Sequence, residues 1–492
     1  MLGQKVKCFK AHTAVSLAQL VPQDNFYRQV EAKLDLSFVR ELVKEQYAAS
    51  MGRPSIDPVV FFKLQLIMFF EGFRSERQLM EQVNLNLASR WYIGYDLDEP
   101  VPNHSSLSKI RSRYGLDVFQ RFFEHIVDLC IEAGLVWGQE LYFDGTKVQA
   151  NAALESLVPR FSVEAKQHLK RLFTSTGPEA SIEPALNEDN PLMSSRGFVE
   201  KYNGTRITGP RMPWYQRTSD SQVSPTDPDA TPMKRFSGDK ARLGYHTHYV
   251  VDGGMARIIL AVLVTPASIM DNTPMLDLAR WSRFRWQLHP KIAVGDAKYG
   301  TVVNIVGLEQ DGIRAYLPTA DSRRGDFYSL DRFRYDAEQD VYFCPQGQRL
   351  TLHHRSPTKQ HCLYRADATV CQVCPVRPEC TTGKAGRSVV RSFFQDYLDR
   401  AVAYRDTAPY QKAMRKRKLW PEPLFGEAKQ WHGLQRFRLR RLWRVNIEGL
   451  MVASGQNLKR LLRYRGKRSP LQPAASGVLP QPAACIPAFL GF

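Results

Sequence analysis

Cysteine and long apolar stretches are both scarce in this chain, and each scarcity excludes a class of protein. Eight Cys in 492 residues are too few for a secreted scaffold held by disulfides. The longest apolar run, 58–70, is interrupted by Lys63 and Gln65 and is too short to cross a bilayer. Residues 1–5 lead into polar sequence, so no signal peptide is expected. We therefore expect a soluble, cytoplasmic protein with no membrane partner.

Negative charge is also in short supply. The chain has 49 Asp and Glu against 68 Lys and Arg, a net charge of +19. Between Lys412 and Arg468 there are 17 Lys or Arg and three Glu, a surplus of +14, with aromatic side chains such as Trp431 and Trp443 among them. A basic run is often only a solvated surface, but this one adjoins a candidate catalytic glutamate. It favours a polyanionic partner, double-stranded DNA, bound in a salt-dependent way.

Three acidic residues stand in separate segments that fit one chemistry. Asp144 ends the apolar run 141–143, and Asp296 ends the run 292–295. Glu422 opens a helix-like segment, 422–429, between two prolines that suit a helix start. Taken alone, an acidic residue in such a place is more often a turn former or a helix cap than a metal ligand. Together, two strand-end aspartates and a helical glutamate supply the hard oxygen ligands of a site for two Mg²⁺ or Mn²⁺ ions.

These segments resemble the bacterial insertion-sequence transposases of the DDE type, IS1182-like within the IS4/IS5 group. Segment 143–146 resembles the strand of the first aspartate and 295–300 that of the second. Glu422 and Lys429 reproduce the Glu, six residues, Lys spacing of the family. The resemblance covers roughly residues 40 to 465. Its most specific part is the C-terminal block, with matches at 425–426, 433–434, 436–437 and 457–460.

The third carboxylate has two rivals, Glu427 and Glu448. Glu422 is preferred because it lies seven residues before Lys429, close to two helical turns, so that both side chains face the same way. The lysine would then hold a DNA phosphate beside the metals, although a solvated helix face has the same spacing. The family's Tyr and Arg before the glutamate would fall at Arg415 and Lys418. Only the second of these is similar in type.

Residues 1–135 are expected to form an α-helical DNA-binding domain, as the resemblance implies. Asp57 and Pro58 begin a helix over 59–70. Ser75 fits a capping box before a second helix that ends near 92. A third, 106–114, would be capped by Asn103 or Ser105, in a pattern like a helix-turn-helix that many small helical cores share. It carries Lys109, Arg111 and Arg113 as candidate DNA contacts.

The catalytic core is expected in residues 136–323 and 401–465. Periodicity alone indicates mixed α/β, and the resemblance implies a ribonuclease H-like fold. A hairpin around 253–254, a helix over 271–284 and a strand over 313–317 follow the first aspartate. Residues 155–235 are rich in Ser, Pro, Asp and Thr and predict a loop-rich insertion. The last segment, 466–492, is predicted to be disordered. From residue 469 it is uncharged and rich in Pro and Ala.

Residues 324–400 contain a cysteine cluster inserted into that core. A Cys-x2-Cys pair with two further thiols in a reducing compartment indicates a structural, tetrahedral Zn²⁺ site in a small zinc-ribbon-like insertion. Cys362 or His361 would replace one ligand if needed, and four unrelated buried thiols are the alternative. The four expected ligands are Cys344, Cys371, Cys374 and Cys380.

The predicted function is that of a DDE transposase, with metal-dependent strand cleavage and strand transfer at the terminal inverted repeats of an insertion sequence. Asp144, Asp296 and Glu422 would be both catalytic residues and Mg²⁺ ligands. The partners would be element ends and target DNA in the bacterial nucleoid, bound by a homodimer in the synaptic complex. Predicted DNA contacts besides those of the helical domain are Lys429, Lys418, Arg417, Arg436 and Arg440.

Two other functions fit the same residues. A nuclease on the same core would cut DNA without joining it, and short inverted repeats flanking the coding region, if found, would argue against it. A non-catalytic DNA-binding remnant or regulator would bind DNA without metal and cut nothing; the mismatch at Arg415 keeps it open.

Overall fold

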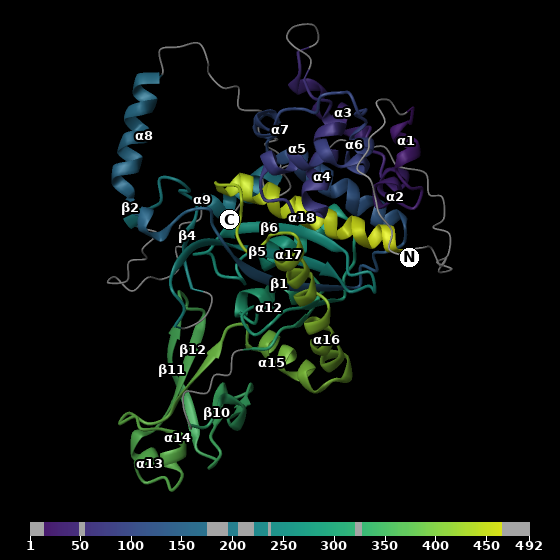
Figure 1. Ribbon diagram of the computed structural model, residues 1–492. Coiled ribbons are helices and arrows are strands. Elements are labelled where there is room, and N and C mark those ends of the chain that lie inside the picture. Colours follow the sequence, from purple (N-terminus) through teal and green to yellow (C-terminus); the bar gives the residue numbers. More distant parts are fainter. Residues whose placement is uncertain are drawn as a thin grey trace, which may run out of the picture.

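A mixed six-stranded sheet lies at the centre of the protein (Figure 1). The computed structural model describes residues 14–48, 55–174, 195–204, 221–234, 238–319 and 327–464, and the tail predicted to be disordered lies outside them. The strand order is β4-β5-β1-β7-β8, with β6 also paired to β5. The strands are β1 (Glu140–Gln149), β4 (Thr231–Met233), β5 (Arg242–Asp252), β6 (Ile259–Pro266), β7 (Ile292–Val294) and β8 (Arg314–Tyr316).

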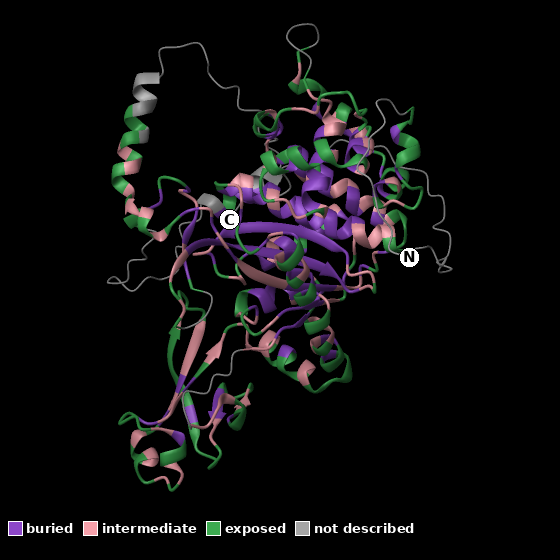
Figure 2. Ribbon diagram, viewed as in Figure 1, coloured by how far each residue is buried: buried purple, intermediate pink, exposed green. Residues whose placement is uncertain are grey.

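The directions of these strands determine which ends meet. β1 runs antiparallel to β5, and β5 antiparallel to β6. β1 is parallel to β7, and β7 to β8. Helices cover a largely buried sheet (Figure 2). This mixed α/β architecture is consistent with the expected ribonuclease H-like core.

The hairpin expected around 253–254 is formed by β5 and β6. Asp252, at the end of β5, fixes the turn because its carboxylate accepts hydrogen bonds from the backbone N–H groups of Trp137, Gly138 and Gly254 at 2.7–2.9 Å. The next predicted helix is shorter than expected, α11 (Met275–Arg285), and the predicted strand over 313–317 is β8.

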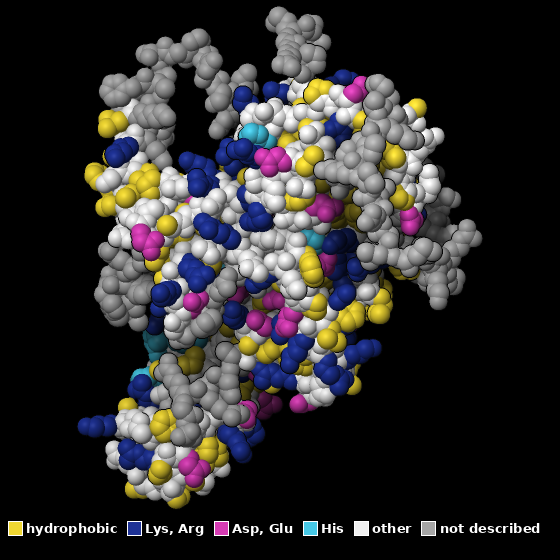
Figure 3. Space-filling model, in the orientation of Figure 1, with side chains coloured by type: hydrophobic (Ala, Val, Ile, Leu, Met, Phe, Trp, Pro, Cys, Tyr) yellow, Lys and Arg dark blue, Asp and Glu magenta, His cyan; other side chains and the backbone are white. Residues whose placement is uncertain are grey.

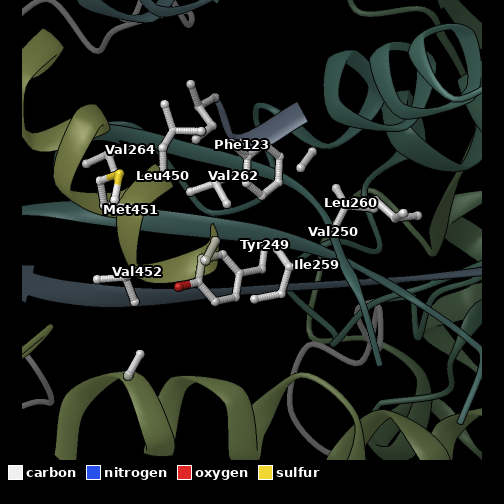
Figure 4. Packing of buried hydrophobic residues seen from close by; sticks show 14 of the residues in the cluster. Phe123, Tyr249, Val250, Ile259, Leu260, Val262, Val264, Leu450, Met451 and Val452 are labelled. Carbon is white, nitrogen blue, oxygen red and sulfur yellow. The ribbon is translucent and has the colours of Figure 1, made fainter. Parts of the chain in front are cut away.

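Helix α18 (Leu442–Arg463) lies between the sheet and the N-terminal helices, and it is mostly buried (Figures 1 and 4). Leu450 and Met451 of α18 pack with Val262 and Val264 of β6 and with Phe123 of the N-terminal helices. Through α18, the hydrophobic core therefore joins the N-terminal helices to one face of the sheet.

Two asparagines of α18 bind the edge of β6 that β5 leaves open. Asn446 accepts from the N–H of Val264 and donates to its carbonyl oxygen, both at 2.8 Å. Asn457 does the same with Ile259 at 2.9 and 2.8 Å. Each side-chain amide takes the place of a backbone N–H and C=O that a neighbouring strand would supply. Side chains of a helix therefore satisfy backbone hydrogen-bonding groups at the edge of β6.

The N-terminal part is helical, as predicted, but its boundaries differ. Asp57 caps the first predicted helix by accepting from the N–H of Val59, as expected. Ser75 makes no capping bond, and the second predicted helix is divided at Asn86, whose backbone is extended. Asn103 caps the third, which continues past a kink at Gly115 to residue 132. The helices are α1 (Leu17–Leu20), α2 (Phe26–Lys33), α3 (Phe38–Val43), α4 (Pro58–Phe70), α5 (Glu76–Leu85), α6 (Leu87–Ile93) and α7 (His104–Glu132).

Further helices connect the strands and complete the core. Tyr410 of α16 and Tyr404 just before it pack on Tyr316 of β8, and Phe425 of α17 stacks on Tyr249 of β5 at 4.3 Å between ring centroids. These ring contacts place the C-terminal helices against the strands. The elements are α12 (Val302–Gln310), α15 (Gln395–Ala403), α16 (Ala408–Leu419) and α17 (Glu422–Trp431), with 3-10 turns at Lys44–Gln46, Leu154–Ser156, Leu330–Arg332 and Tyr404–Asp406.

The cysteine-containing insertion extends away from the core as a second sheet, and its strands lie within the residues 324–400 given for the insertion (Figure 1). Its small core includes Phe333, Tyr342, Leu350 and Tyr364, and much of β11 is exposed (Figure 2). The strand order is β13-β12-β11-β10-β9. The elements are β9 (Arg334–Asp336), β10 (Val341–Phe343), β11 (Arg349–Ser356), β12 (His361–Ala366), α13 (Ala368–Gln372), α14 (Arg377–Cys380) and β13 (Ser388–Ser392).

The described residues of the region 155–235 hold more regular structure than their composition indicated. They include the helices α8 (Arg160–Thr174) and α9 (Ser195–Gly204), and β2 (Val158–Pro159) pairs with β3 (Gln222–Val223). Helix α9 packs on β6 and α18, which explains why a polar segment holds structure. None of the described helices combines the length and apolarity needed to cross a bilayer.

Candidate active site at the ends of two parallel strands

Asp144 and Asp296 lie at the same edge of the sheet. The register of β1 and β7 pairs Tyr142 with Val294, and each aspartate stands two residues beyond its member of that pair. Because the strands are parallel, the two aspartates lie level with each other on neighbouring strands. Asp296 follows β7, whereas Asp144 lies within β1, which continues to Gln149 and does not end at the aspartate as predicted. The sequence prediction that these two residues meet is therefore supported by the register.

Electrostatics couple the acidic residues. Burial raises the pKa of Asp144 to about 6, and the negative charges of Asp296 and Glu422 act in the same direction. The N–H of Gly145, which donates to Asp144 at 2.9 Å, and the positive charge of Arg417 oppose that rise. A carboxylate that is buried and surrounded by like charge is one that a cation would stabilise.

Glu422 stands in the first turn of α17, where the helix dipole favours a negative charge. Arg417, near the end of α16, forms an ion pair with it at 3.3 Å. Seven residues after Glu422, the ammonium of Lys429 donates to the hydroxyl of Thr146 on β1. Helix α17 is thereby attached to the strand of Asp144.

Glu427 does not point to this site but stabilises the packing of α17 on α18. Its carboxylate accepts from Arg460 at 3.0 Å and from Gln456 at 3.2 Å, and His432 lies 3.6 Å away. Burial acts the other way, yet hydrogen bonds from His432 and Arg460 hold the pKa of Glu427 well below its ordinary value. Its charge is already compensated by cations.

Glu448 is also engaged elsewhere. Its carboxylate accepts from the backbone N–H groups of Arg438 and Leu439 at 3.0–3.1 Å, and Arg74 forms an ion pair with it. It therefore holds the loop that precedes α18. Neither rival is placed beside Asp144, which leaves Glu422 as the better third carboxylate.

Comparison with known families agrees with this geometry. Residues 15–113 match a family model described as a transposase domain (DUF772), and residues 219–384 and 343–462 match two models described as transposase DDE domains. The chain belongs to the DDE transposases. Within the transposase, Asp296 and Glu422 fall inside matched residues, whereas Asp144 lies between matched segments and is placed by the pairing of β1 with β7. No curated protein and no solved structure matches the chain.

Membership of this family implies DNA as the partner and dependence on a divalent metal. Across the described part of the transposase, no three His, Cys, Asp or Glu side chains are gathered into a group ready to hold a metal. The donor chemistry of Asp144, Asp296 and Glu422 nevertheless fits Mg²⁺, which prefers carboxylate oxygens and keeps several of its waters.

The predicted DNA-contact residues occupy different environments in the transposase. Lys418, Arg436 and Arg440 are exposed, as are Lys109 and Arg113 on α7. Figure 3 shows Lys and Arg spread over the face it presents. Arg111 is not available: it is buried and ion-paired to Glu76. It stabilises the contact between α5 and α7 instead of facing DNA, because helical spacing turns it inward between its two exposed neighbours.

A loop before α18 brings basic residues of the C-terminal block to β1. The N–H of Phe437 donates to the carbonyl of Gln149 at 2.8 Å, and the N–H of Gln149 donates to the carbonyl of Gln435 at 3.1 Å. Asn151, just beyond β1, accepts hydrogen bonds from both arginines: its side-chain oxygen from Arg436 and its backbone carbonyl from Arg440. Sequence spacing gave no sign of this pairing, which is a contact between segments almost 300 residues apart.

Arg444, which the sequence analysis did not select, joins this loop to the helical domain. Its guanidinium donates to Ser112 of α7 at 3.1 Å, between Lys109 and Arg113 in sequence. The C-terminal block therefore contacts α7 at a residue that stands between two exposed basic residues of that helix. The cluster of charge in the sequence was the signal that pointed to it.

The four predicted zinc ligands of the transposase share one small cavity of about 30 Å³. Cys344 follows β10, Cys371 lies in α13, Cys374 follows α13, and Cys380 ends α14. Burial raises the pKa of the Cys380 thiol, and the other three thiols act in the same direction against Arg387. All four are free thiols, but among these described residues no three thiols are gathered closely enough to form a ready metal site. Cys362 and His361 lie on β12 and do not line this cavity.

Proposed function

We propose that this transposase cuts and joins DNA at the terminal inverted repeats of its insertion sequence, with Asp144, Asp296 and Glu422 as its catalytic carboxylates. One observation carries the proposal: the register of β1 and β7 places both aspartates at one edge. The contact of Lys429 with Thr146 attaches the helix of Glu422 to the same strand.

The three carboxylates would hold two Mg²⁺ or Mn²⁺ ions. When bound, two such ions activate the attacking oxygen and stabilise the leaving oxygen of a phosphodiester. The chain itself orients and balances charge: Arg417 holds Glu422, and the N–H of Gly145 orients Asp144. Lys429 extends toward β1, where its ammonium group would form an ion pair with a DNA phosphate. This chemistry needs no covalent protein–DNA intermediate, so no Ser or Tyr nucleophile is assigned.

The exposed basic residues on the two sides of the contact between Arg444 and Ser112 would bind the backbone of double-stranded DNA, at the element ends and in the target. Lys109 and Arg113 would contact it from the helical domain. Arg436, Arg440 and Lys418 would do so from the C-terminal block, beside the carboxylates. Synapsis of two ends requires two active sites, which favours a homodimer in the synaptic complex, acting in the bacterial nucleoid.

The cysteine cavity would hold one structural Zn²⁺. Four thiolates are a complete tetrahedral set and leave no position for substrate. Support comes from the common cavity and from the free state of Cys344, Cys371, Cys374 and Cys380. The ion would stabilise the end of the second sheet, where the apolar core is small.

The deciding experiment is cleavage and joining of a labelled DNA fragment that carries the element's terminal sequence. The wild type is compared with Asp144→Asn and Glu422→Gln in Mg²⁺, Ca²⁺ and EDTA. We expect nicking at the element boundary in Mg²⁺ alone, followed by joining to target DNA, and loss of both in each variant.

Other outcomes identify other functions. Cleavage without joining under all conditions would indicate a nuclease. Specific binding with no cleavage in any divalent ion would indicate a DNA-binding remnant. Cleavage that survives Glu422→Gln would reject Glu422 as the third carboxylate.

A further inference from the structure

A polar pocket of about 380 Å³ opens at Gly145, the residue after Asp144. We call it the lysine pocket. Three lysines and one aspartate line it, and such a lining suits an anion. The residues lining it are Gly145, Thr146, Lys147, Asp271, Lys298, Lys429 and Gln435.

Lys298 is held in this pocket from three sides. Its backbone N–H donates to the carboxylate of Asp296 at 2.9 Å, and its carbonyl accepts from Asn272 at 3.0 Å. Its ammonium lies 2.9 Å from a carboxylate oxygen of Asp271. The side chain is still 65% exposed. Exposed lysines usually sample many rotamers, so a lysine anchored in this way has lost part of that entropy before any ligand binds.

Asp271 is itself fixed from behind. His246 of β5 lies 3.0 Å from its other carboxylate oxygen. Asp271 is 13% exposed and His246 is 6% exposed, so the pair is held within the core. Both oxygens of Asp271 are engaged, one by Lys298 and one by His246. The carboxylate therefore orients the lysine, while the pocket keeps its positive charge.

We propose that the lysine pocket binds a phosphate of the DNA strand that is cut, next to the phosphate at the carboxylates. Lys298 contacts this phosphate, and Asp271 and His246 are positioning residues that act through it. The proposal rests on the assignment of Asp144, Asp296 and Glu422 as the active site. The pocket begins one residue from Asp144, and Lys298 follows Asp296 by two, so a strand bound at the carboxylates passes the pocket.

A binding experiment tests this without any chemistry. Single phosphates near the cleavage point of the cut strand are replaced, one position at a time, by uncharged methylphosphonates. The dissociation constant of each DNA is measured in Ca²⁺ for the wild type, Lys298→Ala and the control Lys291→Ala, an exposed lysine just before β7 at the far end of that strand.

One position is expected at which the methylphosphonate weakens binding by the wild type at least about tenfold and leaves Lys298→Ala unaffected. The salt dependence of log Kd should fall by about one unit in Lys298→Ala and stay unchanged in Lys291→Ala. The proposal would be overturned if, at every position, the methylphosphonate weakened DNA binding by the same factor in the wild type and in Lys298→Ala. The result stands apart from the carboxylate assignment, since no cleavage is required.

Two further variants separate positioning from folding. Asp271→Asn keeps the lysine charge but frees the lysine. We expect a Kd within about threefold of the wild type, because the rotamer entropy regained by Lys298 and the negative charge lost from Asp271 act on binding in opposite directions. The cleavage rate in Mg²⁺ should fall about tenfold at saturating DNA, and Lys298→Arg should retain part of the wild-type rate. If methylphosphonates affect only joining, and only when placed in the target strand, the pocket serves target DNA and the assignment to the cut strand is wrong.

Discussion

Glu427→Gln and Glu422→Gln should have opposite effects on stability and on catalysis. The two residues lie one and a half helical turns apart on α17, and both are acidic. Glu427 is 24% exposed and is surrounded by Arg460, Lys459 and His432. Glu422 is 49% exposed and has one cationic neighbour, Arg417.

The magnitude follows from these environments. Removing one member of a fully buried ion pair costs about 3–5 kcal/mol, because the partner is left uncompensated. The partial exposure of Glu427 and the amide that remains reduce this to about 2–3 kcal/mol in the free energy of unfolding. For Glu422→Gln the loss is below about 1 kcal/mol, since the pair with Arg417 is half exposed.

The assay combines denaturant unfolding followed by circular dichroism with Mg²⁺-dependent cleavage of end DNA. Glu427→Gln should unfold at lower denaturant and retain cleavage at temperatures where it is folded. Glu422→Gln should unfold like the wild type and cut no DNA. The reasoning is refuted if Glu427→Gln abolishes cleavage with an unchanged unfolding midpoint while Glu422→Gln cuts normally.

Four further results are expected. Asn457→Ala, which removes both bonds to the edge of β6, should lower the free energy of unfolding by about 2–4 kcal/mol in denaturant titrations, and a loss below 1 kcal/mol would show that water replaces the amide. Cys374→Ser should lower the zinc content measured by atomic spectroscopy below one per chain, whereas unchanged content would exclude it as a ligand. Burial lowers the pKa of His248 to about 3, so its neutral form stabilises the fold above the unfolded pKa and this stability is lost as pH falls below about 6.5. The loss is about 2 kcal/mol at pH 5 and should be absent in His248→Gln, as pH-dependent unfolding would show. Lys109→Ala should weaken binding to all DNA sequences by the same factor and reduce the slope of log Kd against log salt concentration by about one. A change in sequence preference would contradict a contact with the DNA backbone.

Much of the active site was accessible from the sequence because its residues carry local signals. Asp144 and Asp296 end apolar runs, and Glu422 opens a helix between prolines. The parallel pairing of β1 with β7 had no local signal, since β7 has only three residues. The choice of Glu422 over Glu427 rested on spacing, and the ion pairs of Glu427 now give it a physical reason.

The misses arose where distant contacts outweigh local preference. Ser75 was expected to cap a helix, but it makes no such bond. Arg111 was expected at the DNA, but the periodicity of α7 turns it inward to Glu76. The polar region containing α8 and α9 was expected to be loops, because composition does not reveal that α9 packs on β6.

The placement of α18 has a consequence for synthesis of the protein on the ribosome. Its Asn446 and Asn457 occupy the open edge of β6, and its apolar face meets α7, so it must be made before the two layers close on each other. Until then, the nascent chain carries an unpaired strand edge and uncovered apolar surface, which are the features that chaperones recognise. Glu422 emerges only about 20 residues ahead of this helix. With Glu422 as the proposed third carboxylate, a transposase molecule becomes competent late in its own translation, and chains released before that point would be unable to cut DNA.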